Sequence, residues 1–372
     1  MIVGGGVMGA SIAYHLATKG IKGIVLLEKE ELGSGSTGRS AACIRHHYSN
    51  RVTAEMAHQS RQVFENFEEL TGHPSDFRKT GYLVLVPPGD EAAFRENLAL
   101  HREVGIAVEE VSLEEVKRIF PQVRTEDLAA AGYERDSGYA EPLSVTSGFA
   151  RRARELGAEI RLGTRLIGIR VSGGRVQAAM TDRGEIETGT IVNAAGPWAA
   201  LVGKMAGVEL PVKPYRRQSF ATEPFPEIPE DAPFIVDFTT SFYFHKEPNG
   251  GVLMGMSDRD EPSSFNTNVD WSFLERVVEQ ALHRAPILGE AKVIRGWAGL
   301  YAVTPDNNPI VGRTPVENFY VACGFSGHGF MHAPTVGRLL AELVSGKELH
   351  MDITTLSLER FAQETIAEYN VI

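Results

Sequence analysis

The stretch MIVGGGVMGA, residues 1–10, decides the fold, because Gly4, Gly6 and Gly9 stand in the spacing GxGxxG. Two apolar residues precede the glycines, and residues 7–17 carry apolar side chains at helical spacing, so the stretch predicts a strand, a tight turn and a helix. The first glycine permits the turn, the second lets the backbone approach a pyrophosphate, and the third lets the helix pack closely on the strand. Free N–H groups at the start of the helix complete a phosphate site.

A second strand and an acidic residue extend this unit. The run IVLLEKE, residues 24–30, predicts a buried strand that ends at Glu28. A carboxylate at this distance after the glycines accepts hydrogen bonds from ribose hydroxyls and repels a 2′-phosphate. The complete pattern favours dinucleotide binding over a turn that only packs a helix on a sheet, and it favours FAD or NAD over NADP.

Composition restricts the function further. The 372 residues carry a formal net charge of -11 and no cluster of Lys and Arg, which argues against nucleic acid or an anionic membrane as the main partner. No apolar run approaches the roughly 20 residues that span a bilayer, and no signal peptide is visible, so we expect a cytoplasmic protein. Cys43 and Cys323 lack a CxxC partner, so we expect reduced thiols and no metal site.

The rest of the chain does not continue the repeated strand–helix units of an NAD domain. It predicts a helix over residues 52–70, a strand in 80–88 and a helix in 112–120 that opens with a capping box. The run TIVNAAGPWA, residues 190–199, predicts a strand that ends in small residues, where a ligand can come close. We interpret Ala195 and Gly196 as a second contact with the same cofactor.

The last third contains FYVACGFSGHGF, residues 319–330, which predicts a strand followed by glycine-rich turns. A helix is predicted over residues 331–344. Its N-terminal N–H groups would face whatever lies at the end of the strand. Because a flavin's pyrimidine edge gains negative charge on reduction, a helix N-terminus there makes the flavin a better hydride acceptor.

Five stretches together resemble the D-amino-acid-oxidase-like family of FAD enzymes, and within it the branch of the sarcosine oxidase and archaeal L-proline dehydrogenase β-subunits. They are GGGVMG with LLEKE, GSGSTGRSAACIRHHYS (33–49), VNAAGPWA (192–199), WAGLYAVTPDNNPIVG (297–312) and GFSGHGFMHAP (324–334). The resemblance implies an α/β fold in which a Rossmann-like FAD-binding domain is interleaved with a mixed-sheet, α+β substrate domain. The first domain would comprise residues 1–75, 143–208 and 300–372, and the second residues 76–142 and 209–299.

The same resemblance implies a reaction and its residues. The reaction is oxidation of the C–N bond of a small amino acid, such as proline, sarcosine or another N-substituted glycine, by hydride transfer to flavin N5, and the imine product then hydrolyses. Arg45 would hold the substrate carboxylate, and Tyr243 and Tyr301 would line the pocket. His328 is expected to serve the cofactor through its backbone. The implied FAD contacts are Gly4, Gly6, Gly9, Glu28, Ser36, Thr37, Leu166, Ala195, Gly196, Gly327, His328, Gly329 and Phe330.

Several positions depart from the family pattern. Gly299 and Pro142 stand where relatives attach their flavin covalently, so we expect non-covalent FAD. Met331 replaces a lysine that helps to hold the carboxylate. Leu253 replaces a lysine that promotes reaction with oxygen, which predicts slow oxidase activity and a partner subunit or electron carrier as acceptor. His46 and His47 are adjacent, so we expect their side chains to point in different directions and do not interpret them as ligands.

Three alternatives stay open. One is a glycine or D-amino-acid oxidase that uses O2. Another is a flavin-carrying β-subunit that is active only with partner subunits. A more distant one is an aromatic hydroxylase, which shares the FAD domain but needs NAD(P)H, and the sequence shows no second nucleotide fingerprint.

Overall fold

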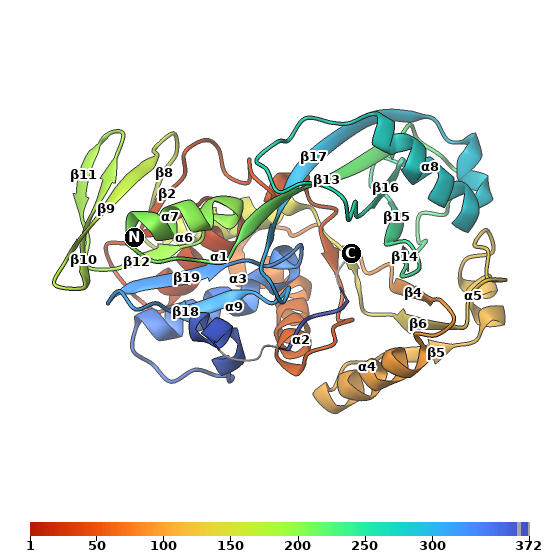
Figure 1. The fold of residues 1–372 in the computed structure, drawn as a ribbon, viewed down its shortest axis with the longest axis horizontal. Helices are drawn as coiled ribbons and strands as arrows, with labels where there is room; N and C mark the ends of the chain where they lie inside the picture. Colours follow the sequence, from red (N-terminus) through yellow and green to blue (C-terminus); the bar gives the residue numbers. More distant parts are fainter. Residues whose placement is uncertain (363–365, 371–372) are drawn as a thin grey trace.

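Two sheets organise residues 1–362 and 366–370, which are the residues that the computed structural model describes (Figure 1). The six-stranded sheet has the order β18-β19-β12-β1-β2-β8, so the N-terminal strand lies in its interior. Its pairs are parallel except β18 with β19. The strands are β1 (Ile2–Val3), β2 (Val25–Leu27), β8 (Glu159–Arg161), β12 (Ile191–Asn193), β18 (Ile310–Arg313) and β19 (Phe319–Cys323).

Helices from distant parts of the chain cover this sheet. Helix α1 packs against α6 and α9, and α2 packs against α9. The hydroxyl of Ser11 in α1 donates to the carbonyl of Ala333 in α9 at 2.7 Å, which fixes the crossing of these two buried helices. The helices of this half are α1 (Val7–Thr18), α2 (Arg51–Glu65), α3 (Phe67–Thr71), α6 (Pro142–Glu155), α7 (Ala199–Met205) and α9 (Gly329–Val344).

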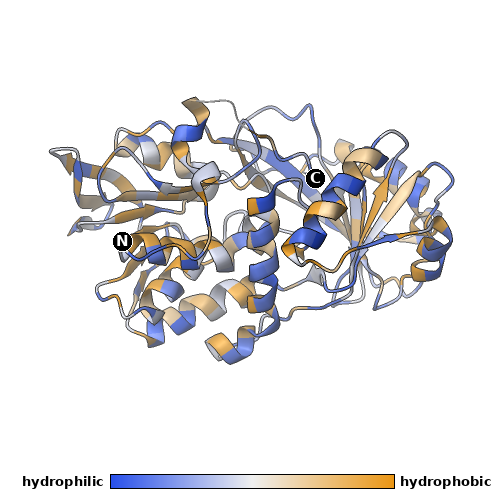
Figure 2. Cartoon of the chain, turned by 90° about the horizontal axis from the view of Figure 1, so that it is seen from below, coloured by the Kyte–Doolittle hydropathy of each residue, from blue (hydrophilic) through white to orange (hydrophobic). Residues whose placement is uncertain are grey.

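The eight-stranded sheet has the order β17-β13-β16-β15-β14-β4-β6-β5. Among the described strands of this eight-stranded sheet, only β14 and β4 pair in parallel. The sheet is therefore mixed, as predicted. The strands are β4 (Tyr82–Val86), β5 (Glu109–Val111), β6 (Ala130–Glu134), β13 (Lys213–Thr222), β14 (Phe234–Asp237), β15 (Phe242–Lys246), β16 (Val252–Met256) and β17 (Val293–Val303). Its strands β14, β15 and β16 are largely buried, and strands at the right of Figure 2 carry the orange of apolar residues. The helices of this half are α4 (Glu91–Val104), α5 (Leu113–Ile119) and α8 (Ser272–Arg284).

Two small sheets complete the structure. Strands β9 (Leu166–Ser172), β10 (Arg175–Thr181) and β11 (Gly184–Glu187) form an antiparallel meander. Strand β3 (Cys43–Ile44) pairs with β7 (Gly138–Tyr139), where Ile44 faces Gly138. This short pair joins the segment before Arg45 to the chain that leaves the eight-stranded sheet.

The structure corrects two predicted elements. The helix predicted over residues 52–70 is broken at Asn66, whose backbone leaves the helical region and whose side chain donates to the carbonyl of Gln62. The last long helix begins at Gly329, two residues before its predicted start. The predicted boundary between the two domains at residues 299 and 300 lies within strand β17. The capping box of Ser112 and Glu115 is confirmed. Within the described part of the chain, no helix combines the length and the apolar character that a membrane span requires.

Candidate active site

A cavity of about 550 Å³ lies beyond the carboxyl ends of β1 and β12. Because parallel strands end at the same edge of a sheet, this is where α/β proteins bind nucleotides. Most of the predicted cofactor residues line it, and Gly9 and His328 do not. The predicted residues on its wall are Gly4, Gly6, Glu28, Ser36, Thr37, Leu166, Ala195, Gly196, Gly327, Gly329 and Phe330.

The glycine turn is sterically required. Gly4 has φ +112°, and a Cβ placed on it would lie 2.5 Å from the carbonyl oxygen of Ala194. A Cβ on Gly9 would lie 1.9 Å from the carbonyl oxygen of Gly4, so Gly9 serves the packing of α1 rather than the cavity wall. The side-chain oxygen of Thr37 accepts from the N–H of Val7 at 3.2 Å and supports the first turn of α1.

The carboxylate of Glu28 stands at the cavity wall and is only 9% exposed. Its oxygens accept hydrogen bonds from the backbone N–H groups of Gly5 at 2.7 Å and Glu30 at 2.9 Å. Each carboxylate oxygen has a further lone pair, so Glu28 can also accept from a ribose hydroxyl. The glycine cradle, the helix N-terminus and this carboxylate therefore fit FAD.

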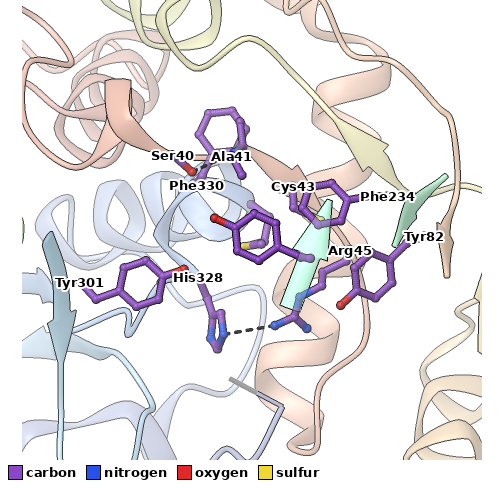
Figure 3. A pocket seen from close by; sticks show the side chains of 13 residues that line it. Ser40, Ala41, Cys43, Arg45, Tyr82, Phe234, Tyr301, His328 and Phe330 are labelled. Atoms are coloured by element: carbon purple, nitrogen blue, oxygen red, sulfur yellow. Dashed lines mark hydrogen bonds between the residues drawn. The ribbon is translucent and has the colours of Figure 1, made fainter. Parts of the chain in front are cut away.

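A smaller cavity of about 50 Å³ adjoins the first and shares Tyr243, Tyr301 and Phe330 with it (Figure 3). Aromatic side chains from both halves of the chain contribute to its wall. Its lining consists of Ser40, Ala41, Ala42, Cys43, Arg45, Tyr82, Phe234, Tyr243, Tyr301, Gly327, His328, Phe330 and Met331. The predicted substrate residues Arg45, Tyr243 and Tyr301 are thus brought together.

Arg45 is the buried charge of this smaller cavity, with 3% of its surface exposed. Its guanidinium donates to the carbonyl oxygens of His47 and Asn370 and lies 3.2 Å from Nε2 of His328. The ring of Tyr48 lies 4.6 Å below it. All of these partners are neutral, and within residues 1–362 and 366–370 no carboxylate lies within ion-pair distance of Arg45.

The imidazole of His328 lines the smaller cavity and contacts Arg45, while its backbone contact with the cofactor stays a prediction. Burial, with a further contribution from the positive charge of Arg45, holds the pKa of His328 well below its ordinary value. The ring is therefore neutral, and Nε2 accepts a hydrogen bond from Arg45. Figure 3 shows this contact, with Tyr301 on one side of His328 and Arg45 on the other.

The structure places Arg217, a residue that the sequence did not indicate, beside one of the two tyrosines. The hydroxyl of Tyr243 lies 3.0 Å from that of Ser219, and burial raises the pKa of both Tyr243 and Tyr301. The guanidinium of Arg217 lies 5.3 Å from the ring of Tyr301 and lines the larger cavity. Arg217 faces this cavity because β13 and β17 pair and place it opposite Gly299. Its position depends on that strand register, so no local signal pointed to it.

Comparison with known proteins agrees with this geometry. A family model described as FAD dependent oxidoreductase matches residues 1–343. The chain belongs to this family. The resemblance seen in the sequence motifs and the predicted fold class are both confirmed.

Members of the FAD dependent oxidoreductase family with solved structures share the whole architecture. L-proline dehydrogenase from P. horikoshii superposes with a TM-score of 0.92 at 31% identity, and 98% of each chain is covered. Glycine oxidase from Geobacillus kaustophilus gives a TM-score of 0.86 at 26% identity, with 96% of this chain and 97% of that chain covered.

Relatives found by sequence include longer proteins. Dimethylglycine dehydrogenase, mitochondrial, of Rattus norvegicus is 30% identical over 391 residues, which cover 99% of this chain and 45% of that protein. Sarcosine oxidase subunit beta of Arthrobacter sp is 29% identical over 97% of this chain and 90% of that subunit. The chain therefore spans about half the length of the mammalian dimethylglycine dehydrogenases that it matches.

The departures from the family pattern fall at different places. Gly299 lines the larger cavity and Met331 the smaller one. Pro142 is the first residue of α6 and lines neither. Leu253, which replaces the lysine expected to promote reaction with oxygen, also lies outside both cavities, while Arg217 puts a positive charge on the wall of the larger one.

The two adjacent histidines face the same carboxylate, which corrects the prediction for them. Nδ1 of His46 lies 3.3 Å from one oxygen of Glu134, and Nδ1 of His47 lies 3.9 Å from the other. Glu134 is at the end of β6 and is buried. The sequence offered no carboxylate close to the histidines, because Glu134 is 88 residues away from His46.

Proposed function

We propose that this chain oxidises the C–N bond of a small N-substituted or cyclic amino acid, such as proline or sarcosine, with non-covalent FAD as the hydride acceptor. The observation that carries the proposal is the buried guanidinium of Arg45, which has only neutral partners among the described residues. A buried charge is unfavourable unless it is paired. A substrate carboxylate would supply the missing counter-charge at the place where the smaller cavity opens into the cofactor cavity.

Arg45, His328 and the carbonyl of His47 then each have a defined task. Arg45 binds the carboxylate and so fixes which hydrogen of the α-carbon points into the larger cavity. His328 and the carbonyl of His47 hold the guanidinium in place. Bound FAD supplies the two-electron chemistry, and the N-terminus of α9, which begins beside Gly327 on the cavity wall, favours negative charge there.

One relative with a solved structure and one found by sequence support the substrate class, and the name of the former, a dehydrogenase, supports an acceptor other than O2. L-proline dehydrogenase and the sarcosine oxidase β-subunit are named for secondary amino acids. The chain is 31% identical to L-proline dehydrogenase over nearly its whole length. We therefore infer a secondary amino acid as substrate and a partner subunit or electron carrier as acceptor.

A second candidate is an oxidase that passes its electrons to O2. Arg217 favours it, because a fixed cation next to the reduced cofactor stabilises the superoxide that forms first. The structural similarity to a glycine oxidase supports the same candidate.

The test is an anaerobic titration of the isolated, FAD-loaded chain with proline, sarcosine, glycine and dimethylglycine. Pyrrolidine and dimethylamine serve as matched controls, since they keep the amine and lack the carboxylate. We expect at least one secondary amino acid to bleach the flavin absorbance and both controls to leave it unchanged. Equal bleaching by the controls would contradict the proposal that Arg45 binds the substrate carboxylate. If no amino acid bleaches the flavin, a β-subunit that is active only with its partners would be the better interpretation.

A further inference from the structure

His47, His101 and Glu134 form a buried cluster behind Arg45. They come from three separate segments, namely the loop after β3, helix α4 and the end of β6. One potential ligand atom from each lies within 4.8 Å of the other two, and none of the three residues is more than 1% exposed. We propose that this cluster binds one divalent transition-metal ion, and that Zn²⁺ fits it best.

Glu134 presents one oxygen to the cluster and uses the other to hold its place. Oε2 accepts from the backbone N–H of His46 at 2.8 Å and from the hydroxyl of Ser137 at 2.6 Å. Oε1 is buried and has no hydrogen-bond partner among the described residues. A carboxylate with one oxygen anchored and the other free has the arrangement of a monodentate metal ligand with an ordered outer shell.

His101 has the same division between an anchored and a free atom. Its Nε2 lies 2.8 Å from the carbonyl oxygen of Tyr48 and 3.1 Å from the backbone nitrogen of the same residue, and the tautomer that donates to the carbonyl leaves Nδ1 without a proton. Its Nδ1 is buried and lacks a partner within the described residues. Histidines that bind metals commonly donate their other N–H to a backbone carbonyl, which fixes the tautomer and the ring orientation.

His47 completes the set, because neither of its ring nitrogens has a partner in the described part of the chain. Its ring packs between Phe94 and Phe238, at centroid distances of 5.8 Å and 5.4 Å, and meets the edge of the His101 ring at 5.1 Å. A buried polar atom without a partner is unfavourable, and here three residues direct such atoms at one point.

The three ligand atoms are close enough to bind one ion if their side chains move slightly toward one another. For three atoms that lie within 4.8 Å of one another there is always a point no more than about 2.8 Å from each, since 4.8 divided by √3 is about 2.8. Zinc lies about 2.0–2.2 Å from imidazole nitrogen and carboxylate oxygen. The three side chains would therefore move inward by roughly half an ångström. Two imidazoles and one carboxylate with an open fourth position are a set that zinc accepts.

The ion would bridge the two halves of the protein behind the substrate pocket. His47 belongs to the loop that follows β3, and its carbonyl oxygen accepts a hydrogen bond from Arg45. Glu134 belongs to β6 of the eight-stranded sheet, and His101 belongs to helix α4 of the same half. The site would thus fix the segment that carries Arg45, in a structural role that is separate from the redox reaction.

The experiment measures zinc retention by the FAD-loaded protein. The holoenzyme is dialysed against a chelator, desalted, mixed with one equivalent of ZnCl2, desalted again and analysed for zinc by mass spectrometry. The decisive variant is His101→Gln, because the glutamine amide can still donate to the carbonyl of Tyr48 while the Nδ1 ligand is removed. Glu134→Gln is the second variant. His283→Gln is the matched control, since His283 is an exposed histidine that pairs with Asp127 at 2.9 Å, far from the cluster in sequence.

We expect about one zinc per chain in the wild type and in His283→Gln, and at least tenfold less in His101→Gln and Glu134→Gln. Zinc should also raise the Tm of the wild type and not that of His101→Gln. The proposal is overturned if the wild type retains no more zinc than His101→Gln, which would mean that a water molecule or a proton fills the cluster. Flavin content reports folding, and if Glu134→Gln loses FAD, His101→Gln decides alone.

Discussion

Nη2 of Arg45 lies 3.2 Å from Nε2 of His328, so the carboxylate-binding candidate is held by an imidazole and not by an acid. Burial and the neighbouring guanidinium keep the pKa of His328 well below its ordinary value, and the ring stays neutral. A neutral partner orients the guanidinium without cancelling its charge. The charge of Arg45 therefore has no ion-pair partner among the described residues, and a substrate carboxylate can pair with it.

Replacing this charge should weaken substrate binding and spare the cofactor. Removing one partner of a buried charge pair costs about 2–5 kcal/mol, and about 1.4 kcal/mol is a factor of ten. We expect Arg45→Met to raise the substrate dissociation constant in an anaerobic titration at least tenfold. His328→Gln, which keeps a hydrogen-bond acceptor near the guanidinium, should change it much less. Normal binding by Arg45→Met, or loss of FAD as its only effect, would contradict the assignment.

The glycine turn should tolerate no side chain at its third glycine. A Cβ at position 9 would lie 1.9 Å from the carbonyl oxygen of Gly4, which is backbone and cannot move aside. We expect Gly9→Ala to yield protein with little or no bound FAD, measured as the ratio of flavin to protein absorbance. Gly189→Ala is the matched control, because a Cβ there meets nothing within 4 Å. Full flavin content in Gly9→Ala would show that α1 can shift without loss of the site.

The flavin should be released intact when the protein is denatured. Gly299 lines the cofactor cavity without a side chain that could form a bond, and Pro142 is not on the cavity wall. After acid precipitation we expect the yellow colour in the supernatant. Colour that remains in the pellet would indicate a covalent link to another residue.

The reaction of the reduced enzyme with oxygen should depend on Arg217. Its guanidinium lies on the wall of the cofactor cavity, beside Tyr301. We expect Arg217→Gln to slow reoxidation by air-saturated buffer at least tenfold in stopped-flow measurements, and Arg217→Lys to keep most of the rate. Reduction by substrate should change little in either variant. Wild-type reoxidation slower than turnover with an artificial dye supports the dehydrogenase, whereas reoxidation as fast as turnover supports the oxidase.

Stability should fall as the pH drops below neutrality. Burial, the largest cause in each case, lowers the pKa of His15 to about 3, of His332 to about 3 and of His245 to about 4. The unfolded chain binds these protons near pH 6.5 and the folded protein does not, so unfolding takes up protons between about pH 6.5 and 4. Each histidine therefore removes up to about 1.4 kcal/mol of stability per pH unit in this window.

The measurement is the Tm of the FAD-loaded protein at several pH values between 7.5 and 5.0. We expect a marked decrease, and a smaller decrease for His245→Phe, in which a ring that stacks on Phe234 is kept without a titratable group. The carboxylate of Glu342 does not interfere in this range, because its pKa is lowered to about 2. A Tm that does not change with pH would mean that the buried histidines already carry protons in the folded state.

Local sequence patterns could predict the cofactor half of the site. Gly4, Gly9 and Glu28 lie within one strand–turn–helix–strand unit, so their spacing along the chain determines their arrangement in space. Arg217 and Glu134 could not be found in this way. Arg217 reaches the cavity through the register of β13 with β17, and Glu134 meets His46 only after β6 has joined the larger sheet. Such contacts depend on tertiary structure and leave no periodic signal.

The interior position of β1 has a consequence for the synthesis of the protein. Ile2 pairs with Val192, and the hydroxyl of Ser11 bonds to the carbonyl of Ala333, so β1 and α1 find their final partners far along the chain, 322 residues away in the case of Ser11. Contacts of this sequence separation form slowly, and until then the apolar edges of β1 and the face of α1 are exposed in the nascent chain. The unit of β1 and α1 thus completes its packing only after Ala333 has been synthesised. Slow translation at low temperature, with chaperones that shield this segment, is the condition under which we expect the highest yield of active enzyme.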